Sequence, residues 1–201
     1  MLLTAIDFET TGLTLHPDAK VQLQPRAIEL AAVTIDTKTM ERKEFVSMFN
    51  PQRPIEPIIT KITGLTNAEL REAPSFASAA DEILRLLDTD ILVAHNLPFD
   101  AYLLYHELRL AGKETEIIWP KTLICTVQLF APFWGRRMKL TDLYKYVMGR
   151  KLEQTHRALD DVDALIEIIL ETKLHEQLST IEGEIGVFIP EELRPHRAGG
   201  R

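Results

Sequence analysis

The stretch LLTAIDFETTG, residues 2–12, decides how the rest of the chain is interpreted. Residues 2–8 form a short apolar run that ends in acid, which is typical of a buried strand. Asp7 and Glu9 stand two positions apart, and in a strand such side chains point to the same face. Two carboxylates on one face of a central strand repel each other and lose hydration, a cost that a divalent cation would relieve. The alternative is that the strand ends at Phe8 and that both acids are solvated.

The segments that follow predict an α/β layer in which helices pack on a sheet. Further strands are predicted at residues 27–35, 42–49 and 91–94, with a weaker one near 116–118. A short helix starts at Thr66, which forms a capping box with Glu69, and Pro74 ends it. Longer helices are predicted over residues 75–87, 98–111, 125–131, 139–148 and 157–174. Residues 12–26 are interpreted as a polar loop and residues 50–58 as a connector.

Composition indicates one ordinary globular domain. The chain has 201 residues, of which 45% are hydrophobic and 26% charged, and its formal net charge is −7. That charge argues against a protein that coats nucleic acid by charge alone, although cations bound at a local site can still hold phosphate. Cys125 is the single cysteine, no apolar run reaches the roughly 18 residues of a membrane span, and no signal peptide is visible, so we expect a cytoplasmic protein.

Asp100 falls in the middle of an apolar helix face. On a helical wheel for residues 98–111, Leu103, Leu104 and Leu108 surround it. Such an acid is seldom fully buried without a partner. The alternative is an acid at a helix start that the macrodipole favours. Glu107 lies on the same face and receives no assignment.

The last predicted helix has three aspartates close together. Asp160 and Asp163 lie on a polar arc that faces solvent, whereas Asp161 lies on the rim of the apolar arc and points inward. His156 precedes the helix. A histidine titrates near neutral pH, which suits a general base, but a lone histidine is more often a surface or capping residue.

Three motifs, taken in order, resemble those of the DEDD 3′–5′ exonuclease family. They are IDFETTG, LVAHNLPFD and HRALDD, beginning at residues 6, 92 and 156. The histidine in the third motif places the resemblance in the branch that includes the proofreading subunits of bacterial replicative polymerases. The positions that match the family's motifs are Asp7 and Glu9 in the first, Asn96 and Asp100 in the second, and His156 and Asp161 in the third.

The resemblance implies a ribonuclease-H-like fold, with a central mixed β-sheet flanked by α-helices. It also implies two Mg²⁺ or Mn²⁺ ions held by the four acids, which agrees with the preference of hard cations for oxygen ligands. His156 would accept a proton from the attacking water, and a nucleoside 5′-monophosphate would leave the DNA strand. The residues implied to contact the terminal nucleotide are Thr10, Thr11, Gly12, Leu13, Asn96 and Phe99.

The implied partners are a nucleic acid with a free 3′ end and a polymerase or another replication or repair protein, without a membrane. Residues 1–174 would form the exonuclease domain and residues 175–201 a C-terminal tail. Thr63 stands where relatives often carry a histidine, so a nucleotide contact there is not expected. The alternatives are an exoribonuclease of the same family, an endonuclease that cleaves hybrids, and a non-catalytic interaction module.

Overall fold

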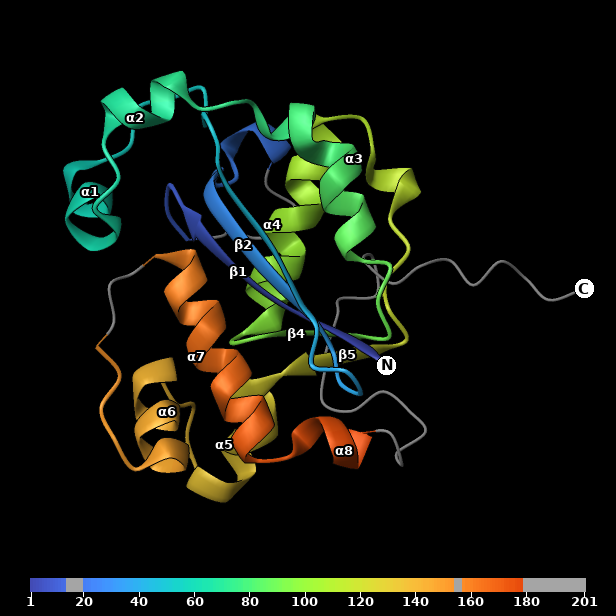
Figure 1. The fold of residues 1–201 in the computed structure, drawn as a ribbon. Helices are drawn as coiled ribbons and strands as arrows, with labels where there is room; N and C mark the ends of the chain where they lie inside the picture. Colours follow the sequence, from blue (N-terminus) through green and yellow to red (C-terminus); the bar gives the residue numbers. More distant parts are fainter. Residues whose placement is uncertain (14–19, 154–156, 179–201) are drawn as a thin grey trace, which may run out of the picture.

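A mixed sheet forms the centre of the protein (Figure 1). The computed structural model describes residues 1–13, 20–153 and 157–178. Within them the strand order is β3-β2-β1-β4-β5. β2 is antiparallel to β1 and β3, whereas β4 is parallel to β1 and β5, which confirms the predicted mixed sheet. The strands are β1 (Leu2–Thr10), β2 (Ala27–Asp36), β3 (Arg42–Met48), β4 (Ile91–Ala94) and β5 (Thr122–Cys125).

Helices cover both faces of this sheet. α7 packs on β1 and β2 from one side, and α3 and α4 pack on the other (Figure 1). Among the described residues, no helix combines the length and the apolar character needed to cross a membrane. The helices are α1 (Pro57–Thr63), α2 (Asn67–Glu72), α3 (Phe76–Leu86), α4 (Leu97–Leu110), α5 (Thr126–Trp134), α6 (Leu140–Met148), α7 (Ala158–Glu171) and α8 (Leu174–Leu178), with short 3₁₀ turns η1 (Val21–Leu23) and η2 (Glu114–Glu116).

The two faces of β1 belong to different apolar cores. Leu3 and Ala5 pack in the core that includes α7, whereas Ile6 and Phe8 pack in the core that includes α3 and α4. Because side chains alternate along a strand, the odd-numbered positions after Ala5 continue on the α7 face. Apolar burial in the first half of β1 therefore decides which helix its later side chains meet.

Two of the predicted elements are wrong. Residues 116–118 do not form a strand: η2 ends at Glu116, and the edge strand is β5, whose first three residues were assigned to no element and whose last residue, Cys125, was predicted to begin a helix. The connector 50–58 contains the start of α1, where Pro57 occupies the first helical position and Gly64 ends the helix with a left-handed φ of 77°.

The ends of the other helices follow the sequence signals more closely. The predicted capping box is present: the Thr66 hydroxyl accepts from the Glu69 amide at 3.3 Å, and the Glu69 carboxylate accepts from the Thr66 amide at 2.8 Å. The last predicted helix, residues 157–174, is α7, which ends at Glu171, and the start of α8. The tail from residue 179 onward lies outside the described residues.

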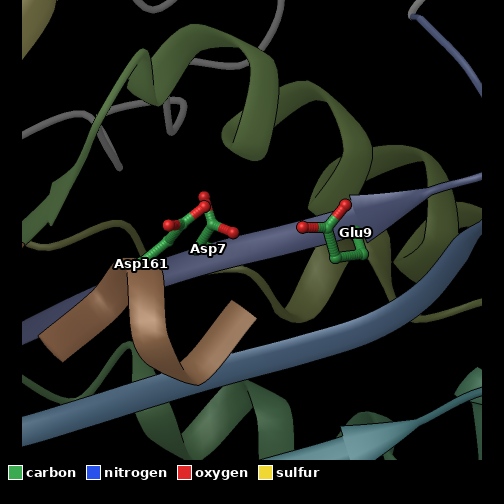
Figure 2. A group of neighbouring side chains, drawn as sticks. All are labelled: Asp7, Glu9 and Asp161. Carbon is green, nitrogen blue, oxygen red and sulfur yellow. The ribbon is translucent and has the colours of Figure 1, made fainter. Parts of the chain in front are cut away.

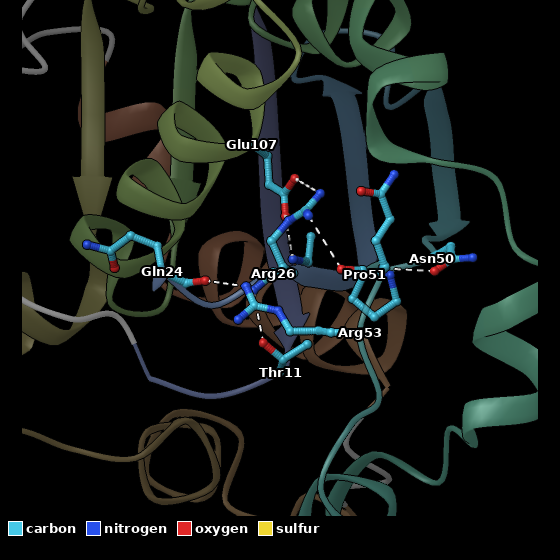
Figure 3. A network of polar contacts seen from close by, with 9 residues as sticks. Thr11, Gln24, Arg26, Asn50, Pro51, Arg53 and Glu107 are labelled. Carbon is cyan, nitrogen blue, oxygen red and sulfur yellow. Dashed lines mark hydrogen bonds and ion pairs between the residues drawn. The ribbon is translucent and has the colours of Figure 1, made fainter. Parts of the chain in front are cut away.

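A buried ion pair holds the start of β2 against α4 (Figure 3). The Glu107 carboxylate accepts from Arg26 Nε at 2.8 Å and Nη2 at 3.0 Å, and also from the backbone amide of Ala27 at 2.8 Å. Glu107 is the acid on the apolar helix face that the sequence left unassigned, and it is fully buried. Its partner comes from a loop far away in the sequence, so helical periodicity alone could not supply it.

We expect Glu107→Ala to lower the free energy of unfolding by about 3–5 kcal/mol, because it leaves the Arg26 guanidinium and the Ala27 amide without their acceptor. The matched control is Asp163→Ala, which removes an exposed ion pair with Arg42 at 2.6 Å and should cost about 0–1 kcal/mol. Urea unfolding of both variants measures the difference. Equal losses in the two variants would contradict this assignment.

Candidate functional site

Three carboxylates from two elements meet at one point on the α7 face of the sheet. Oxygen atoms of Asp7, Glu9 and Asp161 lie within 4.8 Å of one another. Figure 2 shows Asp7 and Glu9 on β1 and Asp161 at the start of α7, with their carboxylates directed toward one another. Residues that are more than 150 positions apart in the sequence therefore form a single anionic cluster, which we call the carboxylate cluster.

β1 positions two members of this cluster because it continues beyond Phe8. Its pairing with β2 reaches Asp7↔Ala31 and Glu9↔Glu29, and the register shifts only between Glu9 and Thr10. Asp7 and Glu9 are both half-buried. The alternative in which the strand ends at Phe8 and leaves both acids solvated is therefore wrong.

The phase of α7 supplies the third member. Asp161 is 8% exposed, whereas its neighbour Asp160 is exposed to solvent, as the helical wheel predicted. Val162 and Leu165 of α7 pack in the same core as Leu3 and Ala5 of β1. The apolar contact between the two elements thus brings the inward acid of α7 to the acids of β1.

Asp100 reaches β1 from α4, at the place where β4 ends. The ladder between β1 and β4 pairs residues only as far as Ala5↔Val93, so the later part of β1 has no β4 neighbour. There the Asp100 carboxylate accepts a hydrogen bond from the backbone amide of Phe8. Asp100 is 2% exposed and lies in the first turn of α4, so it occupies both an apolar face and a helix start.

Crowding and burial oppose ionisation of these acids. Burial raises the pKa of Asp7 well above its usual range, and the charges of Asp100, Asp161 and Glu9 raise it further. Burial, followed by Asp161 and Glu29, raises the pKa of Glu9 to about 8, although Arg157 opposes this rise.

Burial also opposes the ionisation of Asp100, the acid in the first turn of α4. Burial raises the pKa of Asp100 well above its usual range, which the hydrogen bond from Phe8 partly offsets. Burial and mutual repulsion therefore favour the protonated forms of Asp7, Glu9 and Asp100 until positive charge is brought to them.

A second acid of the same region, Glu29, has a guanidinium partner that sequence reasoning missed. Glu29 lies opposite Glu9 on β2 and is fully buried. It accepts from Arg157 Nε at 3.1 Å, from Arg157 Nη2, and from the amide of Ala158 at 3.0 Å. This contact fixes the start of α7 against β2. The available signals were a lone acid inside the apolar run AIELAAVTI and the arginine at the second position of the third motif.

The turn after β1 is ordered by its own hydroxyl groups. Thr10 Oγ1 donates to the Gly12 carbonyl at 2.6 Å, and Thr11 Oγ1 accepts from the Arg26 amide at 2.9 Å. Leu13 is 83% exposed at the end of this turn. These residues lie at the end of the strand that carries Asp7 and Glu9 and directly after it, and their predicted contact with a nucleotide stays a prediction.

Asn96 makes the sharp turn from β4 into α4. Its φ of 79° is left-handed, a conformation that asparagine tolerates better than most residues, and its Oδ1 accepts from Arg137 Nη2 at 2.6 Å. The preceding His95 bonds to Thr126 Oγ1 at 2.8 Å and to the Met138 carbonyl at 3.1 Å. Burial lowers the pKa of His95 to about 4, so its ring is neutral near physiological pH.

The remaining positions that the sequence singled out are Phe99, Thr63 and His156. Phe99 is half-buried in the first turn of α4. Thr63 is buried, and its hydroxyl donates to the Ile59 carbonyl at 3.0 Å, so it serves the end of α1. His156 lies outside the described residues, and its assignment as a general base stays a prediction.

Comparison with known proteins identifies relatives along most of the chain. The RNase_T model, described as exonuclease, matches residues 4–169. The DNA polymerase III subunit epsilon of Rickettsia typhi is 33% identical over 167 residues, which cover 81% of this chain and 70% of that protein. The 3′-5′ exonuclease DinG of Bacillus subtilis is 32% identical over 169 residues, which cover 83% of this chain but 17% of that protein.

Solved structures share the fold. The nuclease domain of 3′hExo, described as a DEDDh family member bound to rAMP, superposes with a TM-score of 0.65 at 19% identity and covers 87% of this chain and 92% of that one. Exonuclease X in complex with 5′ overhanging duplex DNA gives a TM-score of 0.60 at 25% identity, over 85% of this chain and 93% of that one. The family match over residues 4–169 and the relative at 33% identity show that the chain belongs to the exonuclease family, and it shares the fold of a DEDDh family member.

Proposed function

We propose that the chain removes nucleoside 5′-monophosphates one at a time from the 3′ end of DNA. The observation that carries this proposal is the meeting of Asp7, Glu9 and Asp161 within 4.8 Å on the α7 face of the sheet. Relatives at 32–33% identity named as DNA polymerase III epsilon subunits support DNA as the substrate. An exoribonuclease is the second candidate, because one structural neighbour is described as bound to rAMP.

The carboxylate cluster fits divalent cations. Its donors are carboxylate oxygens, which suit Mg²⁺ and Mn²⁺, and the burial and mutual repulsion that raise the pKa of Asp7 and of Glu9 are costs that bound cations would relieve. We propose that Asp7, Glu9, Asp100 and Asp161 hold two such ions. When bound, the ions would stabilise the attacking and leaving oxygens of an in-line displacement at phosphorus.

The remaining roles belong to the protein's own residues. His156 is proposed to take a proton from the attacking water, whose oxygen forms a bond to the terminal phosphorus. The bond from phosphorus to the 3′ oxygen of the penultimate nucleotide breaks, and that oxygen takes up a proton. The turn formed by Thr10, Thr11, Gly12 and Leu13 is proposed to contact the terminal nucleotide, with the exposed Leu13 side chain against its base. Asn96 and Phe99 are proposed to lie beside the same nucleotide.

The biological setting is also a proposal. The chain spans 70–73% of two epsilon subunits but 28% and 12% of two longer relatives, a bifunctional exonuclease/endonuclease of Mycobacterium tuberculosis and a PolC-type polymerase. A polymerase or another replication or repair protein is therefore proposed as a partner. The division into an exonuclease domain over residues 1–174 and a tail over residues 175–201 remains a proposal as well.

End dependence tests the proposed function. We expect a linear single strand with a free 3′ hydroxyl to be shortened to mononucleotides when Mg²⁺ or Mn²⁺ is present. A closed circle and a strand with a blocked 3′ end should resist, because each lacks the terminal group that the site would hold. Gel analysis of 5′-labelled DNA and RNA of matched sequence measures both the direction and the preferred sugar. Rapid nicking of the circle would instead support an endonuclease, and faster loss of RNA would support the second candidate.

A comparison of neighbouring aspartates tests the carboxylate cluster. Asp161→Asn removes one cluster charge with little change in volume, and we expect turnover to fall by orders of magnitude. Without metal the variant should melt at or above the temperature of the wild type, because a repulsive charge is gone. The matched control is Asp160→Asn on the exposed side of α7, which should change stability by no more than about 0.5 kcal/mol and leave turnover nearly unchanged.

Metal-dependent melting shows whether an inactive Asp161→Asn has lost metal binding or has lost activity for another reason. Ions that bind only the folded protein raise its melting temperature, so Mg²⁺ should stabilise the wild type and Asp160→Asn more than Asp161→Asn. An inactive Asp160→Asn beside an active Asp161→Asn would show that the predicted helix phase does not position the acid that matters.

A further inference from the structure

The surface formed by the end of α5, the exposed side of α6 and the loop between them is both aromatic and cationic. Phe133 is 81% exposed and Tyr146 is 60% exposed, and the Trp134 ring meets the Tyr146 ring edge to face at a centroid distance of 4.9 Å. Single exposed apolar side chains are common, but exposed apolar side chains gathered in one patch often serve recognition. We define the α5–α6 surface as Phe133, Trp134, Arg136, Arg137, Lys139 and Tyr146, all of which are exposed.

The charge of this region opposes the charge of the whole protein. Residues 132–151 contain six lysines or arginines and one aspartate, whereas the chain carries a net charge of −7. The acid, Asp142, is 3.7 Å from Arg136, so the region retains an excess of positive charge. A local concentration of cations beside exposed aromatic rings is the arrangement with which proteins bind single-stranded nucleic acid.

Two contacts hold this surface to the motif that carries Asp100. Arg137 donates to the side chain of Asn96, which immediately precedes α4. His95 bonds to the Met138 carbonyl through one ring nitrogen and to Thr126 at the start of α5 through the other. The loop between α5 and α6 is thus fixed beside the end of β4, the same place from which α4 carries Asp100 toward β1.

We propose that the α5–α6 surface binds the part of the substrate strand that precedes its 3′ end. This inference rests on the proposed function and adds the path of the strand outside the carboxylate cluster. The occupant to which it commits is single-stranded nucleic acid: its bases stack on Phe133, Trp134 and Tyr146, and its phosphates lie against Arg136, Arg137 and Lys139. Such contacts tolerate any sequence, because every base has a face on which a ring can stack.

Fluorescence anisotropy with a labelled oligodeoxythymidylate tests binding in the presence of EDTA, so that the strand stays intact. Phe133→Ser should weaken binding by about 5- to 150-fold, the range expected for the loss of one stacking contact. Its melting temperature should match that of the wild type, because the side chain is exposed. The double variant Arg136→Gln/Lys139→Gln should reduce the slope of log affinity against log salt by about 1.4, since each phosphate contact to a single strand contributes about 0.7.

The matched control removes two exposed cations from the opposite edge of the sheet. Lys38→Gln/Lys43→Gln makes the same change in net charge near β3, the edge strand farthest from β5 in the strand order, and should leave the salt slope unchanged. Equal effects of the two double variants would show that only net charge matters, and would overturn the proposal.

Turnover of short and long substrates distinguishes a role of the α5–α6 surface in strand binding from a role in the reaction at the carboxylate cluster. The α5–α6 variants should degrade a dinucleotide like the wild type but require a higher concentration of a long strand, because only the long strand reaches the surface. If the wild type degrades neither substrate, the proposed function fails, while anisotropy still reports on the surface. Variants that bind the strand normally but lose self-association or capture of a protein would overturn the proposal in favour of a protein interface.

Discussion

The repulsion among carboxylates on the α7 face of β1 is the constraint around which this structure is organised. Two buried acids elsewhere in the described residues have a guanidinium within hydrogen-bonding distance: Glu29 has Arg157, and Glu107 has Arg26. Asp7 and Glu9 lie in similarly crowded surroundings, yet burial and neighbouring charge raise the pKa of each. The fold thus neutralises Glu29 and Glu107 with arginine but leaves the repulsion between Asp7 and Glu9 uncompensated. We propose that divalent cations supply the missing positive charge.

Ordinary packing places these acids. Leu3 and Ala5 turn one face of β1 toward α7, and strand alternation then sends Asp7 and Glu9 to the same side. The apolar stripe of α7 settles its rotation and so directs Asp161 inward. The ion pair between Glu29 and Arg157 fixes the start of that helix. Asp100 contacts the part of β1 that extends beyond the end of β4. The contacts of His95 and Asn96 at the end of β4 also hold the α5–α6 surface in place. The proposed path of the strand and the position of Asp100 therefore depend on the same loop.

Local patterns predicted much of this arrangement. Strand alternation put Asp7 and Glu9 on one face and helix phase turned Asp100 and Asp161 toward the core, whereas the family resemblance grouped the four acids, and the capping box located the start of α2. The features that were predicted wrongly or missed depend on contacts with distant parts of the chain. β5 is four residues long, and its pairing with β4 defines it more than its composition does. The prolines of residues 50–58 led to the prediction of a connector where α1 begins, although Pro57 and Gly64 mark the ends of this helix. The partners of Glu29 and Glu107 lie 128 and 81 positions away, beyond the reach of periodicity.

The most direct test of this account counts the protons that leave when metal binds. Calorimetric titration of the metal-free protein with Mn²⁺ near neutral pH, in two buffers of different ionisation enthalpy, measures that number. Because the pKa of Glu9 is raised to about 8, this carboxyl holds its proton in the metal-free state and must lose it to become a ligand. We predict that Glu9 releases about one proton on binding, that this release declines as the pH rises past 8, and that Glu9→Gln removes it. Tight binding without proton release, or a release unchanged in Glu9→Gln, would contradict the claim that cations resolve the conflict among these acids.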